Sequence, residues 1–323
     1  MHYETEAERN SPQAYAAVLD LIRQADTLPI ERAWLAEHHL SPSRGRLPAP
    51  LLMAVAAARE TRRIGVGPGV IVLPLRHPLD VAEQIAVTDL LTEGRLAVGL
   101  GSGGNPEESA AFGVPLAERS DRFAEGLEIV MRALGGEPFA YSGAYYTIPE
   151  VTLVPRPLQR VGDMVWVAAG SQASADLAGR SGGHLLLARG VAADELVRQI
   201  EAYRRGRAEA QLDVTTAHIQ VTRGLYVAET EEEAWRDSAE SIRRHYARLA
   251  RYGGEAVDVR TMAARSDFIV GTPEQCAEGI HTLHARIPVT HLALDIALIG
   301  MPHARVARSL DLFGRAVAPR LGA

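Results

Sequence analysis

Two adjacent histidines, His38 and His39, follow a short apolar run at residues 33–36. Imidazole exchanges protons near neutral pH, so a histidine at the end of a strand is a candidate general acid or base. Successive side chains of an extended chain point to opposite sides, and therefore only one of the pair can face a pocket at that end. A hydrogen-bonded structural role explains a lone histidine there about equally well.

Gly69 and Val70 lie in the glycine-containing run 67–74, GPGVIVLP. Glycine weakens the interior of a strand, and it often marks a bulge where a planar ligand can approach the backbone. A barrel corner that contacts no ligand would use the same residues. Taken alone, the run favours the corner.

A second glycine-rich run, residues 99–104, contains Ser102 and Gly103. The dinucleotide-binding fingerprint G-x-G-x-x-G must open a helix at once, whereas this run leads into Asn105-Pro106, where we expect no helix. Its amides and the Ser102 hydroxyl could still bind a phosphate or the polar edge of a ring.

Gly170, Ser171 and Ser174 follow the apolar run 164–169 and precede a helix-like segment. The N–H groups and the positive dipole end of a helix N-terminus bind phosphate without a basic side chain. Simple capping of the helix by Ser171 is the commoner use of such a serine.

The composition excludes several other kinds of site. All 34 basic residues are Arg, which excludes Schiff-base chemistry on a lysine and the Walker phosphate loop. A net charge of −6 with interspersed signs indicates no nucleic-acid surface. A single cysteine, Cys276, and few possible ligands at strand ends argue against a metal. With no signal peptide or membrane span in evidence, we expect a cytoplasmic enzyme.

These residues must be positioned by the elements around them. Short apolar runs alternate with amphipathic helix-like segments, which is typical of a parallel sheet, either doubly wound or closed into a barrel. Seven runs plus a weak candidate at residues 1–5 would supply the strands of a barrel. We therefore predict an α/β fold, a (β/α)8 TIM barrel with insertions, whose first strand is short or missing. The runs are residues 33–36, 64–73, 96–100, 164–169, 184–188, 219–228 and 291–296.

We predict one domain over residues 1–323. Two stretches are longer than ordinary connections. Residues 135–162, rich in Gly, Pro and Tyr, predict a hairpin insertion, and residues 253–271 are a candidate lid loop, because long loops at a barrel mouth often cover a site. Near the end of the second stretch, Thr272-Pro273 predicts a helix start with Thr272 as its N-cap.

In order and spacing, these segments resemble the bacterial luciferase-like superfamily of flavin-dependent (β/α)8 enzymes. The resemblance runs in one register over residues 11–181 and resumes over residues 268–280. The segments that carry it are WLAEHH (34–39), GVIVLPLRHP (69–78), DLLTEGR (89–95), VGLGSGGNPEE (98–108), ERSDRFAEGLEIV (118–130), WVAAGSQASADLAGRSG (166–182) and FIVGTPEQCAEGI (268–280).

The resemblance implies a role for most of the candidate residues. His38, the first histidine of the E-H-H motif, would lie beside the reactive edge of the flavin. Gly69 and Val70 would form a bulge, often with a non-proline cis peptide, against the isoalloxazine ring. Ser171 and Ser174 would bind the FMN phosphate. Luciferase itself has a phosphate-pairing arginine where this chain has Ser102, so here hydroxyls, amides or another arginine must bind the phosphate.

The implied activity is that of a two-component monooxygenase. Reduced FMN would arrive from a separate NAD(P)H-flavin reductase, and O2 would oxidise a small organic substrate, with His38 steering proton transfer. Two alternatives stay open: a hydride-transfer oxidoreductase that uses an 8-hydroxy-5-deazaflavin coenzyme on the same fold, and a non-catalytic barrel that only binds flavin. Because members of the family commonly dimerise, we expect a homodimer formed through the alanine-rich face of residues 51–60 and the helix-like segment 79–91.

Overall fold

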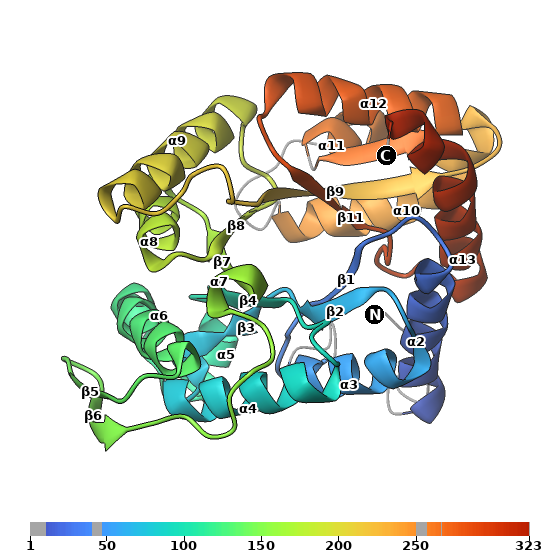
Figure 1. The fold of residues 1–323 in the computed structure, drawn as a ribbon. Helices are drawn as coiled ribbons and strands as arrows, with labels where there is room; N and C mark the ends of the chain where they lie inside the picture. Colours follow the sequence, from blue (N-terminus) through green and yellow to red (C-terminus); the bar gives the residue numbers. More distant parts are fainter. Residues whose placement is uncertain (1–10, 41–46, 250–256, 266, 323) are drawn as a thin grey trace. The chain divides into compact units, whose positions relative to one another are not determined.

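The computed structural model describes residues 11–40, 47–249, 257–265 and 267–322 (Figure 1). The chain divides into two compact units. Unit 1 comprises Met1–Ile30, Leu187–Val197 and Gln220–Ala323, and unit 2 comprises Glu31–Leu186 and Arg198–Ile219. The organisation as one domain stays a prediction.

Unit 2 is built on parallel strands. One sheet pairs β1 with β2, and in a second sheet β8, β7, β4 and β3 follow one another. The elements of this unit are β1 (Arg32–Leu35), α3 (Pro50–Glu60), β2 (Gly65–Pro68), β3 (Ile71–Val72), the 3₁₀ turn η1 (Leu73–Leu75), α4 (Pro78–Leu91), β4 (Val98–Gly101), α5 (Pro106–Ala111), the 3₁₀ turn η2 (Leu116–Glu118), α6 (Arg119–Gly135), β5 (Phe139–Ser142), β6 (Thr147–Val151), α7 (Val161–Met164), β7 (Val165–Ala169), α8 (Gln172–Ser181), β8 (His184–Leu187) and the C-terminal part of α9 (Ala193–Glu209).

The parallel strands of unit 2 are short apolar runs, and every residue of β4 and β8 is buried, as expected for parallel strands covered by helices. Helices α3, α4, α6 and α8 form a row in which each packs against the next (Figure 1). The rings of Trp34 on β1 and Trp166 on β7 meet edge to face with 5.7 Å between their centroids. The cluster around them consists of Trp34, Val70, Ala97, Trp166, Ala168 and Leu186.

Unit 1 is organised around the long strand β9 (Ile219–Val227), with which β10 (Phe268–Gly271) and β11 (His291–Asp295) both pair in parallel. Thr272 caps the helix that follows β10, and its hydroxyl accepts from the Gln275 N–H, which confirms the predicted start. The helical elements of this unit are α2 (Pro12–Asp26), α10 (Glu231–Leu249), α11 (Val259–Arg265), α12 (Pro273–Arg286), α13 (His303–Leu312), the π-helical turn η4 (Phe313–Val317) and the 3₁₀ turn η5 (Ala318–Leu321).

Each of the seven predicted apolar runs coincides with or overlaps a strand, and the run 64–73 contains two, β2 and β3. The weak first strand at residues 1–5 lies outside the described residues. Within residues 135–162 the structure has an antiparallel pair, β5 and β6. Residues 253–271 include α11 and the strand β10, which the sequence did not suggest, and residues 253–256 and 266 lie outside the described part. The role of this stretch as a lid stays a prediction.

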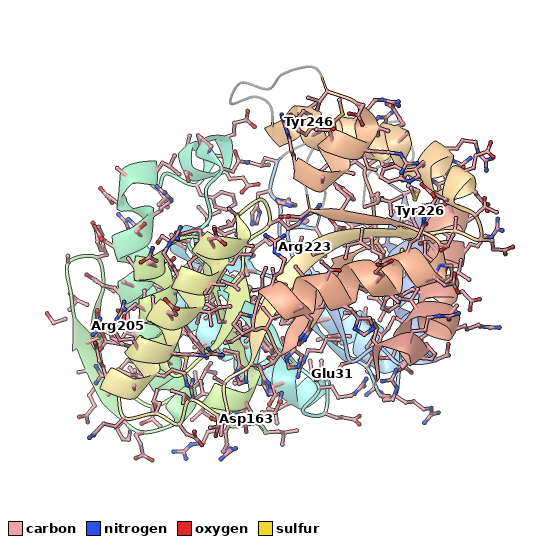
Figure 2. All side chains as sticks on the ribbon, turned by 90° about the horizontal axis from the view of Figure 1, so that it is seen from above. Glu31, Asp163, Arg205, Arg223, Tyr226 and Tyr246 are labelled. Atoms are coloured by element: carbon pink, nitrogen blue, oxygen red, sulfur yellow. The ribbon has the colours of Figure 1, made fainter. Side chains whose placement is uncertain are left out.

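The described end of that stretch is tied to unit 1. Arg260 of α11 donates to Glu231 of α10 at 2.7 Å, and its guanidinium lies over the Trp235 ring. Asp267, just before β10, accepts from the Gly190 N–H at 2.7 Å and pairs at 3.6 Å with Arg223, labelled on β9 in Figure 2. These contacts give α11 and β10 fixed places within unit 1.

Two local expectations are wrong. Asn105 does start a helix, because its Oδ1 accepts from the Glu107 N–H at 3.2 Å and caps the six-residue α5. The alanine-rich face of α3 is not an open surface either: Ala54, Ala57 and Ala58 pack into the core, whereas Leu52 is 74% exposed. Among the described helices, none is long and apolar enough to span a bilayer.

Candidate functional site

The register between β1 and β2 brings the first two sequence motifs together. Leu35 lies opposite Pro68 at the ends of these strands, and the Gly69 N–H donates to the Leu35 carbonyl at 2.9 Å. Residues 37–39 and the bulge at Gly69-Val70 therefore leave two neighbouring strands at the same edge, the carboxyl end, where barrel enzymes carry their sites.

Glu37 organises this edge, although the sequence analysis did not single it out. Its fully buried carboxylate accepts from the Val72 N–H at 2.7 Å, from Arg76 Nη2 at 2.6 Å and lies 2.7 Å from His39 Nε2. A buried carboxylate needs such donors, because transfer from water leaves its charge uncompensated. Glu37 thus joins the segment after β1 to β3 and to the start of the next connection.

The two histidines have different surroundings. His39 is buried between Glu37 and Phe112, whose ring it meets edge on with 4.8 Å between the centroids. The His38 side chain is 31% exposed, and its Nδ1 lies 3.8 Å from Oε1 of Glu108. His39 therefore has the structural position, and His38 is the histidine with an accessible ring.

The predicted bulge is present, and the Gly69–Val70 peptide is cis, as the resemblance implies. Gly69 packs over Trp34 so closely that a Cβ atom would lie 3.1 Å from the indole. Both residues of the bulge are half-buried, so part of their surface stays accessible.

The glycines of β4 have a packing explanation. A Cβ atom at Gly99 or Gly101 would lie 2.9 or 2.7 Å from a methyl group of Val70, and one at Gly103 would lie 2.5 Å from Val72. The run is glycine-rich because β3 and the bulge lie directly over it. Ser102, between two of these glycines, is half-buried, and its hydroxyl makes a long 3.5 Å contact with the Gly103 carbonyl.

At the start of α8 the serines form a capping box. Ser174 Oγ accepts from the Gly170 and Ser171 N–H groups at 3.1 and 3.0 Å, and Ser171 Oγ accepts from the Ser174 N–H at 3.3 Å. The simple capping role is therefore observed. Gly170 and Ser171 are exposed, and nothing lies within 4 Å of a Cβ atom built on Gly170, so this helix end has open space in front of it.

All of the predicted site residues lie in unit 2. The strands β3, β4 and β7 are parallel neighbours: the bulge directly precedes β3 and follows the carboxyl end of β2, and the Ser102 turn and the start of α8 follow the carboxyl ends of β4 and β7. Sequence reasoning missed Glu37 and Glu108. Glu37 could have been found as the acidic residue of the E-H-H motif. Glu108 belongs to the acidic pair at residues 107–108, but acidic residues there are explained equally well by a favourable helix start.

A large histidine pKa shift lies at the opposite ends of the strands. His184, the first residue of β8, has its pKa lowered to about 3, mainly by burial and then by the nearby His218, Arg207 and Arg32. This histidine packs against Trp166 and is a core residue. In the described residues, no group of three His, Cys, Asp or Glu side chains could bind a metal ion.

Residues 1–290 match the family described as luciferase-like monooxygenase. The 4-hydroxyprotoasukamycin monooxygenase of Streptomyces nodosus subsp. asukaensis is 30% identical over 318 residues, which cover 94% of this chain and 85% of that protein. The F420-dependent glucose-6-phosphate dehydrogenase of Beutenbergia cavernae is 28% identical over 99% of this chain and 97% of its own length. The crystal structure of the monooxygenase RslO1 from Streptomyces bottropensis matches with a TM-score of 0.88 at 28% identity, over 98% of this chain and 96% of that one.

The likeness confirms the predicted α/β TIM-barrel fold and the family resemblance. The chain belongs to the luciferase-like monooxygenase family.

Proposed function

We propose that this chain is an FMN-dependent monooxygenase that uses reduced FMN and O2 to oxidise a small organic substrate. The observation that carries the proposal is the accessible Gly69-Val70 bulge at the same strand edge as the half-exposed His38. A planar ring can approach the part of this peptide that Trp34 leaves exposed, and an imidazole beside it can exchange protons with the reacting group.

The residues present fit a flavin mononucleotide. The bulge offers an accessible peptide surface for the ring, and the start of α8 offers exposed hydroxyls and open space for a phosphate. The hydroxyls of Ser171 and Ser174 now bond within the capping box, so binding a phosphate requires them to turn toward it while the helix dipole supplies the favourable potential. We assign Ser102 and Gly103 to the same cofactor.

When bound, reduced FMN supplies the electrons that activate O2. The chain's own part is to hold the ring against Gly69-Val70, hold the phosphate at α8 and keep water from the reacting atoms. His38 moves the proton: its ring, accessible at this edge, donates to or accepts from the reacting oxygen.

A separate NAD(P)H-flavin reductase would deliver the reduced flavin. The glycine run that could be mistaken for a nicotinamide-binding fingerprint is instead explained by the close approach of Val70 and Val72. We also propose a homodimer, because apolar side chains are exposed on the neighbouring helices α3 and α4, namely Leu52, Val87, Leu90 and Leu91. A cytoplasmic location remains part of this proposal.

The second candidate function is hydride transfer with the deazaflavin coenzyme F420. A relative of that description matches nearly the whole chain. Position 102 is Ser and not the phosphate-pairing arginine of luciferase, so this position does not favour FMN over F420. A barrel that only binds flavin is the third reading, and it predicts binding without turnover.

The deciding experiment is an anaerobic titration of the protein with reduced FMN and, separately, with reduced F420, followed by mixing with O2 in the presence of candidate apolar substrates. The proposal expects binding of reduced FMN and transfer of one oxygen-18 atom from labelled O2 to a substrate. Preferential binding of F420, or binding of reduced FMN that yields only hydrogen peroxide with every substrate, would contradict it.

The phosphate assignment is tested with riboflavin, which has the ring but no phosphate. Ser174→Ala should weaken binding of reduced FMN by about tenfold and leave that of reduced riboflavin unchanged, since one charge-assisted hydrogen bond is worth about 1.5 kcal/mol. Ser181→Ala, at the other end of α8, is the control. Equal losses for both flavins in Ser174→Ala would place the phosphate elsewhere.

A further inference from the structure

We propose that Glu108 is the positioning residue for His38: its carboxylate holds the imidazole by Nδ1 and turns the Nε2 edge of the ring toward the bound cofactor. This inference rests on the proposed function, in which His38 acts beside the flavin. It adds a residue that the sequence analysis did not assign.

Helix α5 puts the carboxylate in place. Asn105 caps the helix, Pro106 begins it, and Glu108 follows in the first turn, where an acidic side chain is favoured by the helix dipole. The Glu108 side chain is 6% exposed. Its Oε1 accepts from the His39 N–H at 3.1 Å and lies 3.8 Å from His38 Nδ1. One carboxylate oxygen therefore contacts two consecutive residues of the E-H-H motif.

The other nearby carboxylate is already engaged. Glu37 bonds to Val72, Arg76 and His39, so each histidine has a carboxylate of its own. The two pairs differ in charge balance. Arg76 neutralises Glu37, whereas in the described part of the chain the ion pair recorded for Glu108 is with His38.

The consequence for His38 follows from electrostatics. A buried carboxylate within about 4–6 Å favours the protonated form of an imidazole and fixes a proton on the nitrogen that faces it. Among the residues that the structure describes, the ion pairs at this corner involve Glu37, His39 and Arg76 after β1 and η1, and Glu108 on α5. With Nδ1 committed to Glu108, proton exchange takes place at Nε2. The 3.8 Å separation is long for a hydrogen bond, and such contacts commonly shorten when the ligand binds.

The test is ¹⁵N NMR of the histidine side chains in the full chain without cofactor, with the His38 signals assigned from His38→Gln. In the wild type we expect His38 Nδ1 to keep its proton in the neutral form. In Glu108→Gln the titration midpoint of His38 should fall by about one pH unit. In Glu107→Gln, which changes the exposed neighbour on the same turn, the midpoint should not move. Unchanged His38 signals in Glu108→Gln, or an Nε2-protonated neutral ring in the wild type, would overturn the proposal.

The wild-type spectrum shows which ring nitrogen of His38 carries the proton in the neutral form, so the proposal can be tested even if Glu108→Gln fails to fold. A second measurement connects the pair to the reaction: in Glu108→Gln, oxygenated product per reduced flavin should fall at least about tenfold, with the affinity for reduced FMN unchanged. If the NMR signals shift as expected but no FMN-dependent oxygenation exists in the wild type, the proposed function fails and the pairing stands. If oxygenation exists and the signals do not shift, the pairing fails alone.

Discussion

The Glu37 carboxylate lies 2.7 Å from the backbone nitrogen of Val72, two residues beyond the bulge. Thirty-five positions separate these residues in the chain. The bond fixes β3 relative to the segment that carries both histidines, and Arg76 supplies the positive charge that makes burial of the carboxylate tolerable.

Replacing this carboxylate should destabilise the protein. In Glu37→Gln the amide nitrogen would face either Arg76 or the Val72 N–H, both of which need an acceptor, and Arg76 would lose its counter-charge. We expect the free energy of unfolding in urea to fall by about 3 kcal/mol. The control Glu150→Gln changes an exposed carboxylate on β6 and should stay within about 0.5 kcal/mol of the wild type. A loss for Glu37→Gln no larger than for the control would show that the network contributes nothing.

Gly101, the last residue of β4, and Gly104 in the loop that follows provide a matched pair of substitutions. A Cβ atom in Gly101→Ala would lie 2.7 Å from Val70 Cγ2, so the bulge must move, whereas the Cβ atom in Gly104→Ala meets nothing within 4 Å. We expect Gly101→Ala to cost about 1–3 kcal/mol of stability and to weaken flavin binding, because the ring-facing peptide is displaced. Gly104→Ala should change neither quantity by more than a small amount.

Thermal unfolding and fluorescence titration with FMN measure the two effects. If a folded Gly101→Ala variant bound flavin with wild-type affinity, the bulge would not be part of the cofactor site.

Local signals made much of this architecture predictable. The strands were apolar runs, and Thr272-Pro273 marked a helix start, because capping depends on neighbours three residues away. The strand β10 was missed since four residues, FIVG, within a polar stretch resemble a loop until β9 provides a partner at Gly224–Val227. The sequence could not show that the alanine-rich face of α3 packs into the core, because alanine is suited both to close packing in a core and to a dimer interface.

The candidate site was predictable only in part. His38, the bulge and the serines of α8 each carry a local pattern. Glu37 and Glu108 acquire their positions from contacts with Val72, 35 residues away, and with His39, 69 residues away. Such contacts form only when the strands pair, so they cannot be predicted from the spacing of residues along the chain.

Acid should destabilise the chain through His184. Its folded-state pKa of about 3 lies below the ordinary histidine pKa of 6.5, so between these values the unfolded state binds a proton that the folded state does not. The contribution of this group is therefore complete above pH 6.5 and is lost as the pH falls. Between pH 7.5 and 5 the loss is about 2 kcal/mol for this residue alone. Burial also lowers the pKa of the adjacent His218, which acts in the same direction.

The measurement is urea unfolding at several pH values in the wild type and in His184→Asn, whose amide oxygen can accept the His218 N–H as the imidazole Nδ1 now does. The variant should show a flatter pH dependence. His303→Asn, on an exposed residue of α13, should keep the wild-type slope. Identical slopes in all three proteins would mean that His184 binds its proton at the same pH in the folded and unfolded states.

The proposed homodimer depends on the exposed apolar residues of α3 and α4. A double variant, Leu52→Glu with Leu91→Glu, places like charges on side chains that are 74% and 48% exposed. It should convert a dimer into a folded monomer, since desolvating unpaired charges at an interface costs several kcal/mol. Light scattering after size exclusion measures the mass. Leu212→Glu, on the turn after α9, should remain dimeric. A monomeric wild type, or a dimeric double variant, would refute this interface.

The catalytic assignment is tested by His38→Ala. If the imidazole moves the proton, oxygenated product per reduced flavin should fall about 100-fold, the usual contribution of a general acid or base. Affinity for FMN should change little, because the bulge and the α8 serines are untouched. Stability should also hold, because the His38 ring is partly exposed, whereas His39 fills the core beside Phe112. His303→Ala is the control for loss of an exposed histidine. A wild-type product yield in His38→Ala would remove His38 from the chemistry and leave it a surface neighbour of Glu108.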